Sequence, residues 1–273
     1  MTMIINGEWI AESIIDEVSQ EMKSLNAKVK LVVIQVGKDA ASEVYVRNKV
    51  RAANKIGITS EVRKLPSGTN QDKLIRIIRS LNADKSVNGI LVQLPLPEHL
   101  DVEQILQEID PAKDVDGFHI VNMGKLWTGS SSMVPCTPAG IMHLLKDFDL
   151  AGKKALVVGR SNIVGKPIAQ MLLDKHATVT IAHSRTEDLD QLLDTADIVI
   201  AAVGIPEFIT HCNKDAIVVD VGINRDQNGK LVGDVKRDLE CYAKTVVPGG
   251  VGPMTVAMLM KQTLEAYKIQ KGI

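Results

Sequence analysis

The sequence predicts an α/β protein with two parallel-sheet αβα domains, the C-terminal one Rossmann-like. Apolar β-type runs alternate with helical patterns along most of the chain, which is typical of parallel sheets joined by right-handed crossovers. A glycine turn in residues 156–167 separates a strand from a helix, and residues 112–135 show little periodicity. We therefore expect domains at 1–120 and 138–253, with a C-terminal helix at about 254–273 packed back on the first.

Composition excludes several classes of function. The formal net charge is −1 and aromatic residues make up 3% of the chain, whereas nucleic-acid surfaces need excess basic charge and stacking rings. No apolar run has membrane length and the N-terminus lacks signal-peptide features, so we expect a cytoplasmic chain. The three cysteines, Cys136, Cys212 and Cys241, lack metal-ligand spacing, and we expect reduced thiols and no metal site.

The first domain is predicted to open with an amphipathic helix, because apolar residues recur at helical spacing from Ile10 to Leu25. The same spacing predicts two further helices, one from near Ser42 to Ile56 and one capped by Thr69. The strands are expected at 31–36, 60–65 and 89–94. The first of these is an unbroken β-branched run, which indicates a strand covered on both faces.

The second domain is predicted to begin with a helix at Thr137-Pro138 and to continue into the glycine turn. An apolar strand ends at Gly159, Gly165 follows six residues later, and a helical pattern comes next. This order presents backbone N–H groups to a pyrophosphate. Ser161 stands where the usual motif has its second glycine, so the pattern alone fits a dinucleotide site or an ordinary βα turn equally well.

The next predicted strand, 177–182, strengthens the dinucleotide interpretation. NAD sites usually carry a carboxylate at this strand end, but here the strand runs into Ser184 and Arg185. These two residues and Arg160 offer donors that suit a 2′-phosphate, which favours NADP over NAD. Arg185 fits a solvated loop cation equally well. The remaining strands are expected at 198–203, 216–221 and 245–247.

Chemically useful residues follow the predicted strand ends, where ligands collect in parallel sheets. Gln93, Gly204 and Ile223 close strands, and Asp116 lies in the aperiodic stretch. We expect an active-site cleft between the two domains. Tyr45 and Lys49 are four residues apart and share a helix face, although a pair of this kind is more often a surface lysine beside a half-buried tyrosine.

Several strings resemble the bifunctional methylenetetrahydrofolate dehydrogenase/cyclohydrolase family, the FolD type, in the right order and over essentially the whole chain. The strings are Tyr45-Val46-Arg47-Asn48-Lys49, residues 89–97 (GILVQLPLP), residues 113–117 (KDVDG), Pro135-Cys136-Thr137-Pro138, residues 158–165 (VGRSNIVG) and residues 248–255 (PGGVGPMT). Long strings of this kind in this order are poorly explained by chance.

The resemblance implies that NADP⁺ oxidises 5,10-methylenetetrahydrofolate to the 5,10-methenyl cation, and that water converts this cation to 10-formyltetrahydrofolate. Within one-carbon metabolism this chemistry supplies purine biosynthesis. By the same resemblance Lys49 activates water or moves the proton, with its pKa lowered by burial and by Gln93. Tyr45 is expected to stack on the folate rings, and Asp116 to accept the paired N–H donors of the pterin.

The remaining assignments also follow from the resemblance. The implied catalytic residues are Lys49, Tyr45, Gln93 and Asp116. The implied substrate-binding residues are Tyr45, Lys49, Val92, Gln93, Leu94, Asp116, Pro248, Gly249, Gly250, Val251, Gly252, Pro253, Met254 and Thr255. The implied cofactor-binding residues are Gly159, Arg160, Ser161, Ser184 and Ile223, and the implied assembly is a homodimer. A dehydrogenase without the hydrolytic step and a dinucleotide-sensing protein without turnover stay open as alternatives.

Overall fold

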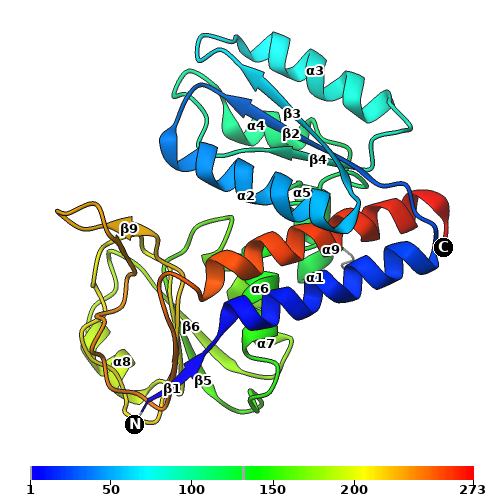
Figure 1. Ribbon diagram of the computed structural model, residues 1–273. Helices are drawn as coiled ribbons and strands as arrows, with labels where there is room; N and C mark the ends of the chain where they lie inside the picture. The colour runs from blue at the N-terminus through cyan, green and yellow to red at the C-terminus, as the bar shows by residue number, and fades with distance from the viewer. Residues whose placement is uncertain (1, 131–132) are drawn as a thin grey trace. The chain divides into compact units, whose positions relative to one another are not determined.

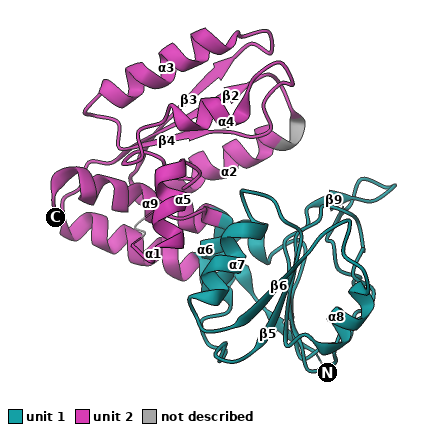
Figure 2. Cartoon of the chain, turned by 180° about the vertical axis from the view of Figure 1, so that it is seen from behind, with its two compact units in different colours: residues 1–11, 137–255 teal, residues 12–136, 256–273 magenta. Residues whose placement is uncertain are grey.

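The computed structural model describes residues 2–130 and 133–273, leaving aside the side chains of residues 40 and 41. The chain divides into two compact units, each built from segments that are distant in sequence (Figure 2). Unit 1 comprises residues 1–11 and 137–255, and unit 2 comprises residues 12–136 and 256–273. The division therefore differs from the expected one at the N-terminus, where the first 11 residues group with the nucleotide-type unit.

The sheet of unit 2 has three parallel strands in the order β3-β2-β4 (Figure 1). They are β2 (Lys30–Val36), β3 (Thr59–Leu65) and β4 (Gly89–Val92). The central strand, β2, buries all its residues after Lys30, as its β-branched composition predicts. Strand β4 ends at Val92, two residues earlier than predicted, so Gln93 and Leu94 belong to the loop at its carboxyl end.

Helices α2 (Ala40–Ile56) and α3 (Gln71–Ala83) connect the strands of unit 2, and α4 (Val102–Gln107) and α5 (Ile120–Trp127) follow β4. Helix α3 packs on the sheet through an apolar stripe that includes Leu74 and Ile78. Its N-cap is Asn70, whose Oδ1 accepts from the Lys73 N–H at 2.9 Å, and the predicted cap Thr69 is buried instead. Neither α4 nor α5 was predicted, because both are too short for a helical period to register.

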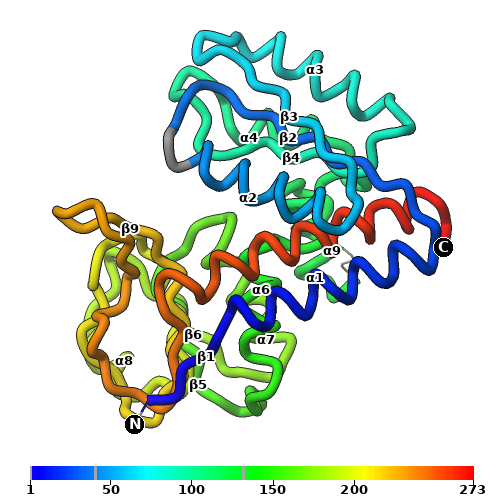
Figure 3. The backbone as a smooth tube through the Cα atoms, in the orientation of Figure 1, coloured from blue at the N-terminus to red at the C-terminus, as the bar shows by residue number. Residues whose placement is uncertain are grey.

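The first and last helices, α1 (Gly7–Ser24) and α9 (Val251–Lys271), run side by side over most of their length (Figure 3). The Lys268 ammonium lies 2.8 Å from the Glu21 carboxylate of α1. Helix α9 also approaches β4 closely, because a Cβ on Gly89 would lie 3.3 Å from Thr263 Cγ2 and 2.7 Å from Val115 Cγ1. A glycine at the start of β4 is what permits this packing.

The sheet of unit 1 has six parallel strands in the order β1-β11-β8-β7-β5-β6. They are β1 (Met3–Ile5), β5 (Lys154–Val158), β6 (Thr178–Ala182), β7 (Ile198–Ala201), β8 (Ile217–Asp220) and β11 (Ala243–Thr245). Strand β11 starts two residues before its predicted position. Strand β1 was not predicted, because it has three residues and exposes Met3 and Ile4, so it shows neither alternation nor a buried run.

Helices α6 (Cys136–Leu144), α7 (Gly165–Leu173) and α8 (Leu189–Thr195) complete unit 1 with a hairpin of β9 (Asn224–Arg225) and β10 (Leu231–Val232). One face of the sheet packs on α8 through Leu193 and on the chain between β7 and β11 through Ile209 and Val235. The hairpin was not predicted, since each strand has two residues. Across the described ranges, no helix is both long and apolar enough to span a membrane.

Candidate functional site

Helix α2 carries the predicted lysine into the interior of unit 2. The helix starts after Asp39, whose Oδ2 accepts from the Ser42 N–H at 2.7 Å. Tyr45 and Lys49 follow one turn apart, Tyr45 partly buried and Lys49 only 7% exposed. The Lys49 Nζ donates to Gln93 Oε1 at 3.1 Å, so the fold brings together two predicted residues from a helix and a strand end.

The Gln93 side chain is fixed at the carboxyl end of β4. Its backbone N–H donates to Ile34 O at 2.8 Å and prolongs the pairing with β2. Its side-chain Nε2 donates to Leu94 O at 2.6 Å. These two bonds hold the amide with its oxygen on the ammonium of Lys49, which is the orientation a neutral acceptor needs beside a cation.

Asp116 is the third predicted residue near Lys49 and Gln93. Burial raises the pKa of the Asp116 carboxyl, and the nearby Lys49 cation opposes that rise. The second carboxylate, Asp114, raises the pKa further, and a hydrogen bond with the Cys136 thiol lowers it. The lysine and the carboxylate therefore lie within electrostatic reach of one another, in a setting where each is partly removed from water.

Two residues in this group were missed from the sequence, Cys136 as a site residue and Gln262 altogether. Gln262, on α9, donates from Nε2 to Val115 O at 2.7 Å and to Cys136 Sγ at 3.1 Å, and its Oε1 accepts from the Val134 N–H at 2.8 Å. Burial and the Asp116 charge raise the pKa of the Cys136 thiol well above its ordinary value. The only sequence signal for Gln262 was a polar residue among the apolar positions of the last helix.

Other members of the resembling strings have structural roles. Lys113 is 6% exposed, and its Nζ donates to the carbonyls of Leu81, Asn82 and Asp84 at 2.8–3.0 Å, which closes the C-terminus of α3. Asp114 Oδ2 accepts from the His119 N–H and from the Asn122 side-chain amide.

One predicted substrate residue lies in the core. Val92 is 2% exposed and packs in the hydrophobic core of unit 2, whereas Leu94 stays partly exposed beside Gln93. A further position, Gly117, has φ +71°, and a Cβ there would lie 2.4 Å from the Val134 carbonyl carbon. This glycine allows the loop that carries Asp116 to pass the chain leading to Cys136.

The predicted dinucleotide turn joins β5 to α7 in unit 1. Gly159 has φ +123°, and a Cβ there would lie 2.2 Å from Ala202 O of the neighbouring strand end. A Cβ on Gly165 would lie 2.2 Å from Gly159 O. Both glycines are therefore required for the close packing of turn, helix and sheet. Because β6 and β7 flank β5 on opposite sides, this turn lies at the switch point of the sheet, where such folds bind ligands.

Ser161 has a defined role in the turn. Its Oγ accepts from the Val164 N–H at 3.1 Å and from the Gly165 N–H at 3.2 Å, which leaves the hydroxyl hydrogen to donate elsewhere. Arg160 and Ser184 are exposed, at the carboxyl ends of β5 and β6. This set of donors, with no carboxylate between β6 and Arg185, fits the phosphates of NADP.

Two buried carboxylates that the sequence analysis missed shape the neighbouring loops. Asp234 Oδ2 accepts from the Val203 and Gly204 N–H groups at 2.7 and 2.9 Å, at the end of β7. Asp220 Oδ1 accepts from the Gly222 N–H at 3.0 Å, at the end of β8. Burial raises the pKa of Asp220 to about 6, against the backbone N–H bonds that lower it. Ile223, 48% exposed, extends from the loop that Asp220 holds.

The predicted 248–255 segment is held from both sides within unit 1. Gly249 O accepts from the Glu8 N–H at 3.1 Å, and the Thr255 and Thr137 hydroxyls lie 3.0 Å apart. Met254 is fully buried and Val251 is 5% exposed, so both pack rather than face solvent. The more accessible members are Pro248, Gly249, Gly252, Pro253 and Thr255.

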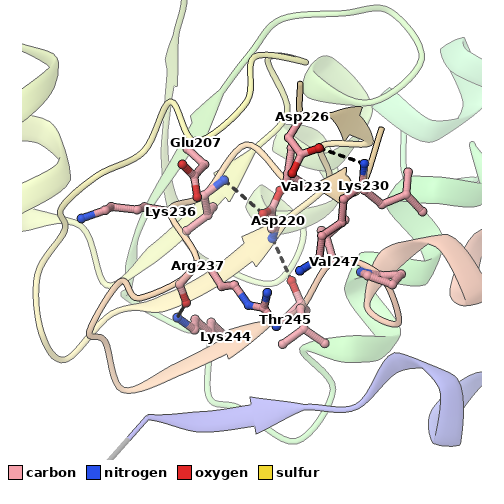
Figure 4. Close-up of a pocket in the computed structure, with 15 residues that line it drawn as sticks. Glu207, Asp220, Asp226, Lys230, Val232, Lys236, Arg237, Lys244, Thr245 and Val247 are labelled. Atoms are coloured by element: carbon pink, nitrogen blue, oxygen red, sulfur yellow. Dashed lines mark hydrogen bonds between the residues drawn. The ribbon is translucent and has the colours of Figure 1, made fainter. Parts of the chain in front are cut away.

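A cavity of about 500 Å³ lies on unit 1 where β8 and β11 meet the chain around the β9–β10 hairpin (Figure 4). Both basic and acidic side chains line it, including Lys230, Lys236, Asp220 and Glu207. Within the described part of the chain, its lining includes none of the five predicted cofactor residues and reaches the 248–255 segment only at Pro248.

Unit 1 has a parallel sheet with a glycine turn at its switch point, and unit 2 holds a buried lysine beside an amide and a carboxylate. This combination is typical of a nucleotide-dependent oxidoreductase with two α/β units. Comparison with known proteins specifies the class. The chain belongs to the tetrahydrofolate dehydrogenase/cyclohydrolase family: the model of the catalytic domain matches residues 5–116 and that of the NAD(P)-binding domain matches residues 135–271.

Individual relatives agree with this membership, which confirms the predicted family. The Bifunctional protein FolD of Streptococcus pyogenes serotype M5 (strain Manfredo) is 52% identical, with 97% of this chain and 98% of the relative covered. The crystal structure of the bifunctional FolD enzyme from Campylobacter jejuni has a TM-score of 0.95 at 44% identity, covering 98% of this chain and 99% of that one. The Trypanosoma brucei enzyme, solved with NADP and an inhibitor, has a TM-score of 0.95 at 36% identity, covering 100% and 99%.

Proposed function

We propose that this chain oxidises 5,10-methylenetetrahydrofolate with NADP⁺ and hydrolyses the resulting methenyl cation to 10-formyltetrahydrofolate. The observation that carries the proposal is the Lys49 ammonium, 7% exposed, 3.1 Å from Gln93 Oε1 and within electrostatic reach of Asp116, in a chain of this family. A dehydrogenase that lacks the hydrolytic step has no need of a lysine held in this way, so that alternative is disfavoured.

The hydrolytic step needs a group that moves protons. Water adding to the methenyl carbon must lose a proton, and the ring nitrogen that leaves this carbon must gain one. Lys49 moves this proton, and Gln93 sets the direction in which the amine points. Because the Gln93 amide is itself held by Leu94 O, the geometry of the pair is fixed before substrate arrives.

Asp116 and Tyr45 bind the folate. A carboxylate accepts two parallel N–H donors, and the pterin presents such a pair. Burial raises the pKa of Asp116, and the nearby Lys49 cation opposes that rise and favours the ionised carboxylate. Tyr45, one helical turn before Lys49, offers a ring for stacking.

The dinucleotide is held by unit 1. NADP⁺, when bound, supplies the acceptor for the hydride. Arg160, Ser161 and Ser184 donate to its phosphates and ribose, Gly159 allows the backbone to approach, and Ile223 presents an apolar side chain. Hydride transfer itself needs orientation rather than acid–base help, so these residues act by positioning.

The test is a paired assay of both reactions with both dinucleotides, on the parent and on Lys49→Ala. Lys49→Ala should lower the conversion of methenyl- to 10-formyltetrahydrofolate by about 100-fold or more, because it removes the proton carrier. NADP⁺ reduction should fall far less. Lys55→Ala, which changes an exposed lysine of the same helix, is the matched control and should leave both rates unchanged. Hydrolysis at the parent rate by Lys49→Ala would remove Lys49 from the mechanism.

The domain assignment and assembly form part of the same proposal. Residues 1–120 with the final helix supply the folate side, and residues 138–253 supply the NADP side. The family resemblance also favours a homodimer. Light scattering on the protein as it elutes from a size-exclusion column measures its molar mass directly. A molar mass near that of one 29.7 kDa chain would exclude the homodimer.

A further inference from the structure

Two carboxylates to which the proposed function gives no role lie buried at the carboxyl end of the sheet in unit 1. Asp220 ends β8 and is 5% exposed, and Asp234 follows β10 and is fully buried. The two residues are linked directly, because Asp220 Oδ1 accepts from the Asp234 N–H at 2.8 Å. A buried carboxylate is costly unless it is hydrogen-bonded, so the partners of this pair show which parts of the chain it holds in place.

Asp234 joins the loops that follow two neighbouring strands. Its Oδ2 accepts from the N–H groups of Val203 and Gly204 at 2.7 and 2.9 Å, in the loop after β7. Its Oδ1 accepts from the side-chain amide of Asn224, the first residue of β9, at 2.8 Å. Because β7 and β8 pair in parallel, both loops lie at the same edge of the sheet, and one side chain fixes them relative to each other.

The residues on either side of Ile223 are both held by this pair of carboxylates. Gly222 donates its N–H to Asp220 Oδ1 at 3.0 Å, and Asn224 donates to Asp234. A Cβ on Gly222 would overlap Asp234 Oδ1, so a glycine is needed for the chain to pass this close. Ile223 itself is 48% exposed, although burial of its apolar side chain would be favourable. The held neighbours therefore keep this side chain exposed at the edge of the sheet.

Asp220 anchors the loop that carries Asp234. Its Oδ2 accepts from the Val235 N–H at 3.0 Å, and its own N–H donates to Thr245 Oγ1 of β11 at 2.8 Å (Figure 4). Two consecutive N–H groups, those of Asp234 and Val235, therefore bond to one carboxylate at the end of β8. This arrangement sets the direction in which the Asp234 side chain points.

The two loops joined by Asp234 lie on the side of the nucleotide turn away from β6. In the proposed function the turn after β5 binds the pyrophosphate, and Arg160 and Ser184 lie near the 2′-phosphate at the ends of β5 and β6. Strand β6 flanks β5 on one side, and β7 and then β8 follow on the other. A dinucleotide whose adenosine half runs from the turn towards β6 extends its nicotinamide half towards β7 and β8.

We propose that Asp234 is a positioning residue for the nicotinamide half of NADP⁺, an inference that rests on the proposed function. Asp234 acts through the backbone of Val203 and Gly204 and through Asn224, and it fixes the surface around Gly204 and Ile223 before the dinucleotide binds. A preformed surface binds a ligand without the entropic cost of ordering two loops.

The proposal predicts a pattern of binding that differs from that of Arg160. NADP⁺ and NAD⁺ share the nicotinamide half, so a change at Asp234 should weaken both by the same factor. Adenosine 2′,5′-bisphosphate has no nicotinamide half, and its binding should not depend on Asp234. Hydrolysis of methenyltetrahydrofolate consumes no dinucleotide, and its rate should also be insensitive.

The test measures binding by calorimetry on the parent, on Asp234→Ala and on Asp238→Ala. Asp234→Ala leaves three donors without their acceptor, and should lower the affinity for NADP⁺ by about 10-fold or more. The KM values for NADP⁺ and NAD⁺ should rise by this same factor. The affinity for adenosine 2′,5′-bisphosphate and the rate of hydrolysis should stay within about twofold. Asp238→Ala changes an exposed aspartate four residues further on and is the matched control, with all values as in the parent.

Amide hydrogen exchange without any ligand gives a second measurement. The N–H groups of Val203 and Gly204 should exchange about 10-fold faster or more in Asp234→Ala, because they lose their acceptor. The Gly159 N–H, which donates to Ala182 O, should exchange as in the parent. Unchanged exchange at Val203 and Gly204 would show that Asp234 does not hold this loop.

The outcomes separate this inference from its alternatives. Affinity for NADP⁺ equal to that of the parent, or a loss confined to NADP⁺ and absent for NAD⁺, would overturn it. An equal loss for adenosine 2′,5′-bisphosphate would show that Asp234 supports the whole of unit 1 instead. A parent that binds neither NADP⁺ nor this fragment would refute the proposed function, and the inference with it.

A milder variant keeps the test decisive if Asp234→Ala does not fold. Asn224→Ala removes only the donor beside Ile223 and leaves the bonds to Val203 and Gly204. It should weaken NADP⁺ and NAD⁺ alike by about threefold and leave adenosine 2′,5′-bisphosphate unchanged. Parent affinity for both dinucleotides in Asn224→Ala would then count against the inference.

Discussion

Two glutamines buried in unit 2 show how differently one residue type can be satisfied. Gln262 is 4% exposed and makes hydrogen bonds through both ends of its amide, to Val134, Val115 and Cys136. Gln35, on β2, is 2% exposed, and neither atom of its amide has a hydrogen-bond partner among the described residues. A buried amide without partners costs free energy that a leucine of similar size does not.

Gln35→Leu should therefore raise the free energy of unfolding by about 1–2 kcal/mol. Gln262→Leu is the matched control, and should lower the free energy of unfolding by about 2 kcal/mol, because the Val134 N–H loses its partner and Val115 O keeps only the Cys136 thiol. Urea midpoints at constant slope measure both. A Gln35→Leu variant less stable than the parent would show that the amide is bound, for instance by a buried water.

We propose that Arg160 favours NADP⁺ over NAD⁺. It is exposed at the nucleotide turn, and no carboxylate between the end of β6 and Arg185 competes for a ribose hydroxyl. Arg160→Ala should raise the KM for NADP⁺ by about 10-fold or more and leave that for NAD⁺ nearly unchanged, because only NADP⁺ carries the 2′-phosphate.

Arg185→Ala serves as the comparison for Arg160, since this residue is also exposed but fits a solvated loop cation. Its effect on the KM for NADP⁺ should be smaller. Equal changes in the KM for NADP⁺ and NAD⁺ in Arg160→Ala would place that guanidinium elsewhere than on the 2′-phosphate.

At the scale of elements, the sequence predicted the buried strands and the motif-bearing loops well, because burial on both faces leaves an unbroken apolar run. Strand β2 was predicted one residue short of its observed extent. The short elements were missed for the opposite reason: β1, β9 and β10 have two or three residues, and α4 has six. Strand β1 forms by pairing with β11, which is distant in the sequence, and β9 and β10 form by pairing with each other, so none of them depends on a local pattern.

The candidate site shows the same difference between what a local sequence pattern reveals and what only the fold determines. Lys49, Gln93 and Asp116 were identified through strings that resemble the family, but Lys113 carries the same kind of signal and closes helix α3 instead. A string shared with a family therefore marks a residue as part of the family pattern, but it does not show which groups that residue contacts. Asp220 and Asp234 gave no signal, because the fold alone brings their partners near: backbone N–H groups for both, and the Asn224 side-chain amide for Asp234.

Asp220, at the end of β8, makes the stability of unit 1 depend on pH. Burial raises its pKa from 3.8 to about 6. The folded state therefore binds the proton more tightly than the unfolded state, so this stabilisation is complete below pH 3.8 and is lost as the pH rises through about 6. The size of the change is about 3 kcal/mol, from roughly two units at 1.36 kcal/mol each.

Asp220→Asn does not titrate, so the stability of the parent minus that of the variant should fall by this amount between pH 4 and pH 7. Denaturant titrations of both proteins at a series of pH values measure the difference. A difference that rises with pH would mean that the three backbone donors, Gly222, Asp234 and Val235, outweigh burial and hold the pKa below its ordinary value.

At the scale of the whole molecule, neither unit is one continuous stretch of chain. Residues 1–11 belong with 137–255, and residues 256–273 belong with 12–136. Helices α1 and α9 each contain residues of both units, so each unit depends on a segment from the far end of the chain. The sequence analysis expected the final helix to pack back on the first domain, but it placed residues 1–11 in that domain as well, because the pairing of β1 with β11, near the other end of the chain, leaves no local trace in the sequence.

The contribution of the N-terminal residues to unit 1 can be tested by removing strand β1. Strand β1 pairs in parallel with β11, and Ile5 is its one buried residue. Deleting residues 2–5 removes this pairing, exposes the edge at residues 243–245, and should lower the stability of unit 1 by about 1–3 kcal/mol.

Unit 2 should be spared, because its sheet receives no residue from the deleted segment. Amide hydrogen exchange resolves the two units: faster exchange in β11 and β8, with β2 and β4 unchanged, is the expected result. Ile5→Ala is a milder second variant in case the deletion does not fold, and it should speed exchange in β11 by a smaller factor. Equal acceleration in both sheets would show that the two units unfold as one.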